Sequence, residues 1–194
     1  MEHWRYYIQG RALEAVRQHD AAITTYRAAL RTKPDFHRCT NRIAYILASQ
    51  QRYAEAAENF SRLVKLDPDN AVAHFNLGYS REQLGQQQDA IGSFRAATRL
   101  NPKIDRAWYG MGICHAHLGQ HAEAAVALEQ VALLQPMNPH AWYALGMAQH
   151  ANGNAARLRE FMLHLLRFDP RIARRLIEES ESTALAYLVK DLMP

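Results

Sequence analysis

One short stretch gathers residue types that bind metals. Residues 114–121 read CHAHLGQH, one cysteine and three histidines in eight positions, and a second cysteine, Cys39, lies far upstream. Thiolate sulfur and imidazole nitrogen are the usual ligands of zinc, but they must converge on the ion as a tetrahedron. Whether these side chains form a site therefore depends on the elements that position them.

The sequence offers little other chemistry. It contains no Gly-x-Ser-x-Gly, His-Glu-x-x-His or Cys-x-x-Cys motif, and no glycine-rich phosphate loop. Carboxylates are scattered on faces expected to be solvated, for example Glu55, Glu58, Asp89 and Glu123. We therefore predict no catalytic residue, no enzymatic activity and no cofactor.

Composition is that of an ordinary soluble protein. Of 194 residues, 48% are hydrophobic and 22% charged, which argues against disorder. No apolar run approaches eighteen residues, and the N-terminal residues lack the pattern of a signal peptide. Two cysteines are too few for a disulfide framework, so we expect a cytoplasmic protein with reduced thiols. The net charge of +4 is only mildly basic.

A period of 34 residues runs through the chain. Five of the seven prolines keep this step, as do columns of small residues, alanines, large apolar residues and turn glycines. The proline column is Pro34, Pro68, Pro102, Pro136 and Pro170; the small column is Gly10, Ala44, Gly78, Gly112 and Gly146; the alanine column is Ala22, Ala56, Ala90 and Ala124; the large column is Tyr26, Phe60, Phe94, Leu128 and Met162; the turn glycines are Gly85, Gly119 and Gly153.

Each period predicts a helical hairpin. In residues 71–102, Ala71–Leu84 is a helical run ended by Gly85, which tolerates the left-handed conformation that closes a helix. Asp89–Leu100 is a second helix with one apolar stripe, and Pro102 cannot continue it. A single hairpin cannot bury its apolar face, so neighbouring hairpins must stack into a solenoid.

These columns resemble those of tetratricopeptide repeat proteins, whose unit is a 34-residue helix-turn-helix. The resemblance implies an all-α, right-handed solenoid with five repeats at about residues 3–36, 37–70, 71–104, 105–138 and 139–170. Residues 71–136 match best. In the first repeat, Arg17 occupies the position of the turn glycine. Leu158 replaces the alanine of the fifth repeat, where we expect wider helix packing.

Residues 171–194 lie beyond the repeats. RIARRLIEES predicts a capping helix, and TALAYLVKDLMP predicts a short helical tail capped by Ser182, which packs on the solenoid or on another molecule. No flexible linker occurs, so we expect one domain.

The resemblance implies that the first helices of successive repeats line a concave groove that receives a peptide or protein. By column, the inward-facing residues are Trp4, Tyr7, Arg11, Arg38, Asn41, Arg42, Tyr45, Phe75, Asn76, Tyr79, Glu82, Arg106, Tyr109, His117, His140, Tyr143, Met147 and His150. All of these except Trp4, Glu82, His140, Met147 and His150 form the predicted partner site. Its aromatic and arginine content is typical of binding hot spots and suits a partner segment with apolar anchors and acidic groups.

Some of these residues are common in such repeats whatever they bind, namely Tyr7, Asn76, Tyr109 and Tyr143. Five others are not generic choices and carry more of the functional prediction: Arg38, Arg42, Tyr45, Tyr79 and Arg106. The predicted function is a non-catalytic scaffold or adaptor for a partner protein. Self-association through the first helix is a further possibility, because the chain begins with Trp4, Tyr6, Tyr7 and Ile8 without an N-terminal cap.

Two other functions stay open. RNA binding would use the groove together with six arginines between residues 157 and 175, although acidic residues interrupt and follow that run. The second open function is that of a co-chaperone, a subclass of the same family that binds the C-terminal carboxylate of chaperone tails. The corresponding positions here are Asn41, Tyr45, Asn76, Arg106 and Gly110, of which only Asn76 matches and Arg106 is a tolerable substitute.

The repeat register also divides CHAHLGQH. His115 and His117 end one helix, Gly119 is the turn, and His121 begins the next helix. Residues two apart on a helix point to different faces, and His115 shares a packing column with Leu13 and Leu47. The ligands therefore diverge, and we predict no metal site, with His117 left as a groove contact.

Overall fold

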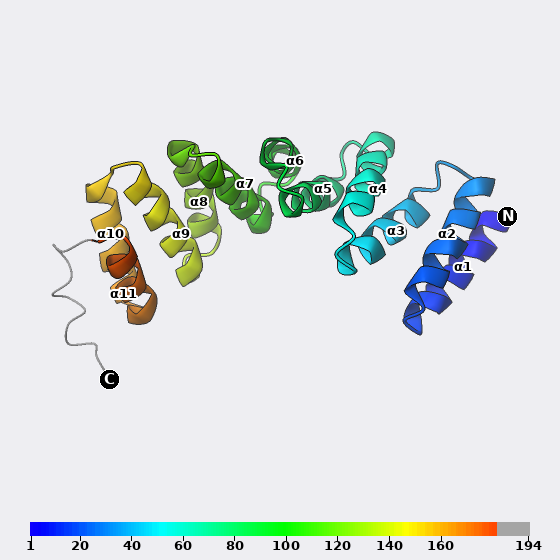
Figure 1. Cartoon of the computed structure of the whole chain (residues 1–194), viewed down its shortest axis with the longest axis horizontal. Helices are drawn as coiled ribbons and strands as arrows, with labels where there is room; N and C mark the ends of the chain where they lie inside the picture. The colour runs from blue at the N-terminus through cyan, green and yellow to red at the C-terminus, as the bar shows by residue number, and fades with distance from the viewer. Residues whose placement is uncertain (182–194) are drawn as a thin grey trace. The chain divides into compact units, whose positions relative to one another are not determined.

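The computed structural model describes residues 1–181, which form eleven α-helices and no β-strand. The described helices (Figure 1) belong to two compact units, which divide between Asn101 and Pro102. The first unit contains α1 (Glu2–Ala15), α2 (His19–Thr32), α3 (His37–Ser49), α4 (Tyr53–Leu66), α5 (Ala71–Gln83) and α6 (Gln87–Leu100). The second contains α7 (Asp105–His117), α8 (His121–Leu134), α9 (Pro139–Ala151), α10 (Ala155–Leu166) and α11 (Pro170–Glu179).

Consecutive helices pair as hairpins, three in the first unit and two in the second, with α11 after the last pair. This confirms the predicted all-α repeat fold with a capping helix. The predicted helix from Asp89 begins two residues earlier, at Gln87, because the carbonyl of Gln86 already accepts the amide of Ala90 at 2.9 Å. The predicted helical tail and its cap at Ser182 lie outside the described residues.

The turn inside each hairpin uses a left-handed residue. Gly85, Gly119 and Gly153 have φ between 70° and 73°, as the glycine column predicts. The first two hairpins place Arg17 (φ 61°) and Gln51 (φ 60°) at the same column. A side chain in this conformation is disfavoured by contact with the backbone, so both turns carry strain that the glycine turns avoid.

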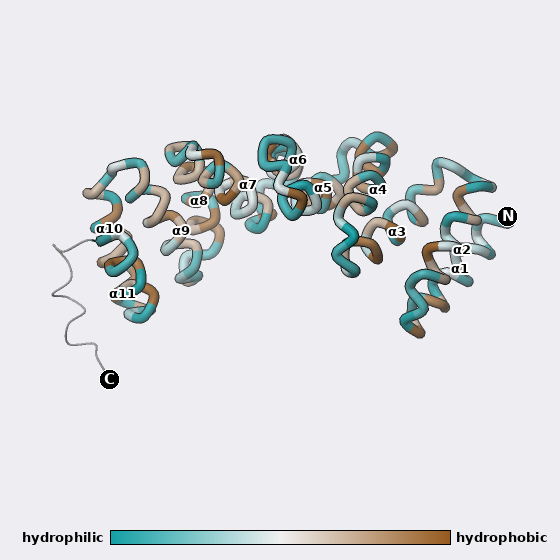
Figure 2. Tube along the Cα trace, viewed as in Figure 1, coloured by the Kyte–Doolittle hydropathy of each residue, from teal (hydrophilic) through white to brown (hydrophobic). Residues whose placement is uncertain are grey.

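Small residues of the first helix let the second helix approach closely. A methyl group added at Gly10 would lie 2.4 Å from the ring of Tyr26, and one at Gly78 would lie 2.7 Å from the ring of Phe94. Gly112 faces Leu128 in the same way. Apolar and polar residues accordingly alternate along the helices of both units (Figure 2).

The fifth hairpin is packed differently. The three atoms nearest to an added methyl at Gly146 all belong to Leu176 of α11, and not to the second helix of its own hairpin. Leu176 is fully buried, together with Ala173. The side chain of Asp169 caps α11 by accepting the amide of Ile172 at 3.1 Å. The capping helix thus completes the apolar core of the last hairpin.

A recurring hydrogen bond fixes the loop before three of the first helices. The indole nitrogen of Trp142 donates to the carbonyl of Pro136 at 2.8 Å, and that of Trp108 donates to the carbonyl of Pro102 at 2.9 Å. His74 Nε2 lies 2.9 Å from the carbonyl oxygen of Pro68 in the same column. These side chains therefore have a structural role that the repeat pattern alone did not reveal. None of the eleven described helices is long and apolar enough to cross a membrane.

Candidate functional site

The predicted partner site is exposed along the first helices of both units. None of its thirteen residues is buried, whereas packing residues of the same helices, such as Ile43 and Leu77, are at most 4% exposed. Nine of the thirteen lie in the first unit, from Tyr7 to Tyr79, and four in the second, from Arg106 to Tyr143. Each first helix thus divides its side chains between core packing and an accessible face.

Tyr45 and Tyr79 are the most prominent aromatics of this face in the first unit. Their exposed fractions are 37% and 40%. The amide nitrogen of Asn76 donates to the hydroxyl of Tyr45 at 2.8 Å, and the Tyr45 ring meets the buried Phe60 edge-on at 5.6 Å. Tyr79 packs edge-on against Tyr53 of α4 at 6.0 Å, and its hydrogen bond with Tyr53 raises its pKa. Both rings are therefore held in place yet remain accessible.

A carboxylate that the sequence did not single out organises the first two hairpins. Glu14 of α1 has a side chain only 17% exposed. It accepts the Tyr26 hydroxyl at 2.9 Å and Arg42 Nε at 3.0 Å, and it forms an ion pair with Arg42, with Arg11 at the edge of the pair. Burial and the nearby Arg11 lower the pKa of Arg42. The charge of Arg42 is thus already paired within the chain.

An aromatic group surrounds the start of α1. The rings of Trp4 and Tyr7 lie 5.1 Å and 5.6 Å from that of Phe36, which is buried. The guanidinium of Arg38 lies over the Trp4 ring at 5.2 Å, a cation–π contact. Trp4 remains 41% exposed. The repeat columns predicted Trp4 on the inward face, and in the structure its ring stacks under the guanidinium of Arg38.

The outer face of α1 differs from the equivalent face of later first helices. At one packing column α1 has Arg5, where the other first helices have Cys39, Ala73, Ala107 and Ala141, all at most 2% exposed. At the next it has Gln9, where they have Ile43, Leu77, Met111 and Leu145. A polar outer face is typical of a terminal repeat. This face therefore gives little support to self-association through α1, which stays a prediction.

The second unit presents its own part of the predicted site. Tyr109 is 39% exposed, and Arg106 and His117 are exposed as well. Tyr143 is instead engaged by α11. Its hydroxyl donates to Glu179, whose other oxygen accepts Arg175 Nε at 2.7 Å, and the Arg175 guanidinium lies over the Tyr143 ring at 4.8 Å. Burial, and secondarily Glu179, raises the pKa of Tyr143.

The cysteine- and histidine-rich stretch is distributed as its repeat register predicts. Cys114 is fully buried, and His115 is 8% exposed with its Nδ1 2.7 Å from Gln120 Oε1. His117 ends α7 on the exposed side, and His121 begins α8 after the turn at Gly119. Within residues 1–181 no group of three or more histidine, cysteine or acidic side chains is arranged to hold a metal ion.

Half of the arginine-rich C-terminal cluster is neutralised within the chain. Arg157 pairs with Glu129 at 2.6 Å and with Glu160 at 2.8 Å. Arg174 and Arg175 pair with glutamates one turn later on α11, each at 2.7 Å. These contacts leave a surface of mixed charge, not a continuous basic patch.

Comparison with known proteins agrees with the repeat architecture. Residues 7–71, 43–103 and 75–135 each match the model of the Tetratricopeptide repeat family. The chain is 34% identical over 79 residues, 41% of its length, to Small glutamine-rich tetratricopeptide repeat-containing protein 2 of Mycosarcoma maydis. It is 34% identical over 71 residues, 37% of its length, to the Peroxisomal targeting signal receptor of Eremothecium gossypii. These matches span only 22% and 12% of the two relatives.

Solved structures of similar fold cover nearly the whole chain. A crystal structure of MamA superposes with a TM-score of 0.79 at 21% identity, covering 94% of this chain and 95% of MamA. YrrB, described as a TPR protein with an unusual peptide-binding site, superposes with a TM-score of 0.79 at 20% identity, covering 91% and 90%. At such identity the likeness shows the fold alone. Together with the match of the family model to more than half of the sequence, it establishes that this chain belongs to the tetratricopeptide repeat family.

Proposed function

We propose that this chain is a non-catalytic scaffold that holds a peptide or protein partner against the exposed face of its first helices. The observation that carries the proposal is the pair Tyr45 and Tyr79, successive residues of one repeat column. Each is more than a third exposed although its ring is fixed by neighbouring side chains. Rigid exposed aromatics bind at low cost in conformational entropy, which is why they are frequent in hot spots.

The contacts of the arginines refine the mechanism. In the first unit Arg42 forms an ion pair with Glu14. We therefore assign the recognition of acidic groups on the partner to Arg38, whose guanidinium stacks on the Trp4 ring. The names of two similar proteins, a peroxisomal targeting signal receptor and a protein with a peptide-binding site, support a peptide as the partner. Cys39 and Cys114 are both buried and are not joined in a disulfide, which fits the cytoplasmic location that we propose.

The two alternative functions have less support. RNA binding requires available cations, and three of the six arginines at the C-terminal end are ion-paired. A carboxylate clamp is matched only at Asn76, with Arg106 as a substitute, and one of the two N–H donors of the Asn76 amide is already used by the hydroxyl of Tyr45. A peptide bound through aromatic anchors remains the best explanation of the exposed face.

A double variant tests the proposal. Replacing Tyr45 and Tyr79 with alanine should remove partner capture from a lysate of the native host, while the helical circular dichroism spectrum is retained. The matched control replaces Val16 and Leu66, apolar residues of the same unit that are 64% and 42% exposed but lie outside the groove columns. This control should capture the same partners as the wild type. Equal capture by both double variants would refute the proposed site.

A further inference from the structure

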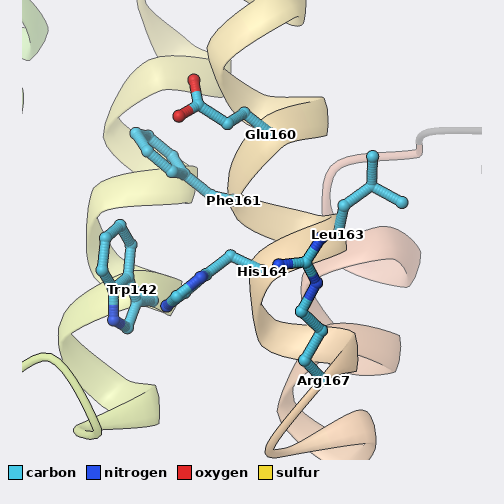
Figure 3. Close-up of a pocket in the computed structure, with 6 residues that line it drawn as sticks. All are labelled: Trp142, Glu160, Phe161, Leu163, His164 and Arg167. Atoms are coloured by element: carbon cyan, nitrogen blue, oxygen red, sulfur yellow. The ribbon is translucent and has the colours of Figure 1, made fainter.

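The fifth hairpin contains a pocket that is separate from the groove columns. Its volume is about 290 Å³, near the lower end of the range for small-ligand sites. It opens between α9 and α10 within the second unit and is lined by Trp142, Glu160, Phe161, Leu163, His164 and Arg167 (Figure 3). None of these residues belongs to the predicted partner site, so the groove proposal leaves the pocket unexplained.

A bulky side chain at a normally small column, Phe161, forms part of the wall of this pocket. Phe161 occupies the column that holds Ala127 one repeat earlier, and Leu158 occupies that of Ala124. Phe161 is 2% exposed, and its ring lies 5.5 Å from that of Trp142. The fourth hairpin also has a tryptophan, Trp108, with the same hydrogen bond to the preceding loop, but it lacks the facing phenylalanine.

The walls of the pocket present two flat rings and an unsatisfied nitrogen. The imidazole of His164 lies 4.3 Å from the indole of Trp142, and the two side chains face each other in Figure 3. His164 Nε2 is buried and has no hydrogen-bond partner within residues 1–181. A buried polar atom without a partner is unfavourable, so a ligand that supplies one gains affinity.

The charge at the mouth of the pocket is positive. Glu160 is neutralised by Arg157 at 2.8 Å. Arg167 is exposed on the opposite side and forms no ion pair with any described residue. The guanidinium is therefore available to an anion, and its planar donors suit a carboxylate.

We propose that this pocket binds an aromatic ring that carries a carboxylate. The ring packs against Trp142 and His164, a polar atom of the ligand satisfies His164 Nε2, and the carboxylate pairs with Arg167. The ligand is either a free aromatic acid or the C-terminal aromatic residue of a peptide, which present the same chemistry.

The indole N–H signals in a two-dimensional ¹H–¹⁵N NMR spectrum of the full chain test this proposal. The protein has three tryptophans, and a Trp142→Phe variant identifies the relevant signal. Titration with N-acetylphenylalanine should shift the Trp142 signal and leave that of Trp108, its counterpart in the fourth hairpin, unchanged. N-acetylphenylalanine amide, which has the same ring but no charge, should bind about tenfold more weakly because its carboxylate is missing.

Two arginine variants complete the experiment. Arg167→Ala should weaken N-acetylphenylalanine by about tenfold, whereas Arg171→Ala, which removes another exposed arginine at the start of α11, should have no effect. Tighter binding of a tetrapeptide ending in phenylalanine would identify a chain terminus as the ligand, and equal or weaker binding a free acid.

The proposal is overturned if the Trp108 and Trp142 signals shift equally, or if the acid and its amide bind alike. It is also overturned if Arg167→Ala binds as the wild type does. Because the Tyr45 and Tyr79 variants lie in the first unit, failure here leaves the groove proposal standing and open to its own test.

Discussion

The left-handed turn column offers a paired test of the repeat architecture. Gln51 and Gly85 occupy the same column in successive hairpins of the first unit, with φ of 60° and 73°. One is a long side chain in a conformation that favours glycine, and the other is glycine itself. Gln51→Gly and Gly85→Ala therefore perturb one backbone geometry in opposite directions.

The expected magnitudes follow from two opposing contributions. A non-glycine residue in the left-handed region costs about 1–2 kcal/mol, and glycine costs about 0.5–1 kcal/mol through its greater freedom in the unfolded chain. Gln51→Gly should therefore stabilise its hairpin by about 0.5–1 kcal/mol. Gly85→Ala should destabilise by a similar amount, because no atom lies within 4 Å of the added methyl group and backbone strain is the only penalty.

Urea denaturation and native-state hydrogen exchange measure these changes. Since each repeat contacts only its neighbours, the effects should be largest in the mutated hairpin, α3–α4 for Gln51 and α5–α6 for Gly85. Changes of the same sign in both variants, or no change in either, would refute the assignment of strain to this column.

Two further predictions concern helix packing and the C-terminal cap. Gly92→Ala should stabilise α6 by about 0.8–1 kcal/mol through helix propensity, as the added methyl meets no atom within 4 Å. Gly10→Ala should instead destabilise by about 1 kcal/mol or more, because its methyl would overlap the buried Tyr26 ring; urea denaturation that shifts both variants alike would contradict this packing. Hydrogen bonds from Arg175 and, secondarily, from Tyr143 hold the pKa of the Glu179 carboxyl below its ordinary value of 4.5. The stability that ionised Glu179 contributes to the fold is therefore present above pH 4.5 and is lost as the pH falls through the folded-state pKa. Glu179→Gln should thus weaken amide protection of α11 at pH 7 and converge with the wild type once the pH falls below the folded-state pKa of Glu179, and a difference independent of pH would count against the pairing.

The repeat period predicted the hairpins because its signals are local. Prolines end the second helices, and a glycine at a fixed distance from each proline closes the first helix in three hairpins. The columns also predicted which face of each first helix is accessible, since Ile43 and Leu77 are buried while Tyr45 and Tyr79 are exposed. Column position likewise predicted that His115 and His117 lie on different faces of their helix, and His115 is buried while His117 is exposed.

Features that depend on particular side-chain conformations could not be predicted. Glu14 and Arg42 are 28 residues apart and meet only because two hairpins bring α1 and α3 together. Leu176 covers Gly146 in a helix that begins at Pro170 itself, whereas the earlier prolines of this column lie in the turns between helices, and the period alone does not specify this difference. The aromatic pocket likewise depends on how Phe161 and His164 pack against α9, although the phenylalanine at the column that holds Ala127 one repeat earlier was a visible signal.

Partner capture by the Tyr45 and Tyr79 double variant tests the central claim most directly. The measurement is quantitative affinity capture from the native host with the wild type, this variant and the Val16 and Leu66 control, followed by calorimetric titration of the captured partner. Loss of each aromatic hot spot should cost about 2–4 kcal/mol, so the double variant should show no measurable binding while the control binds as the wild type does. Wild-type affinity in the folded double variant would show that the exposed aromatic face is not the binding site.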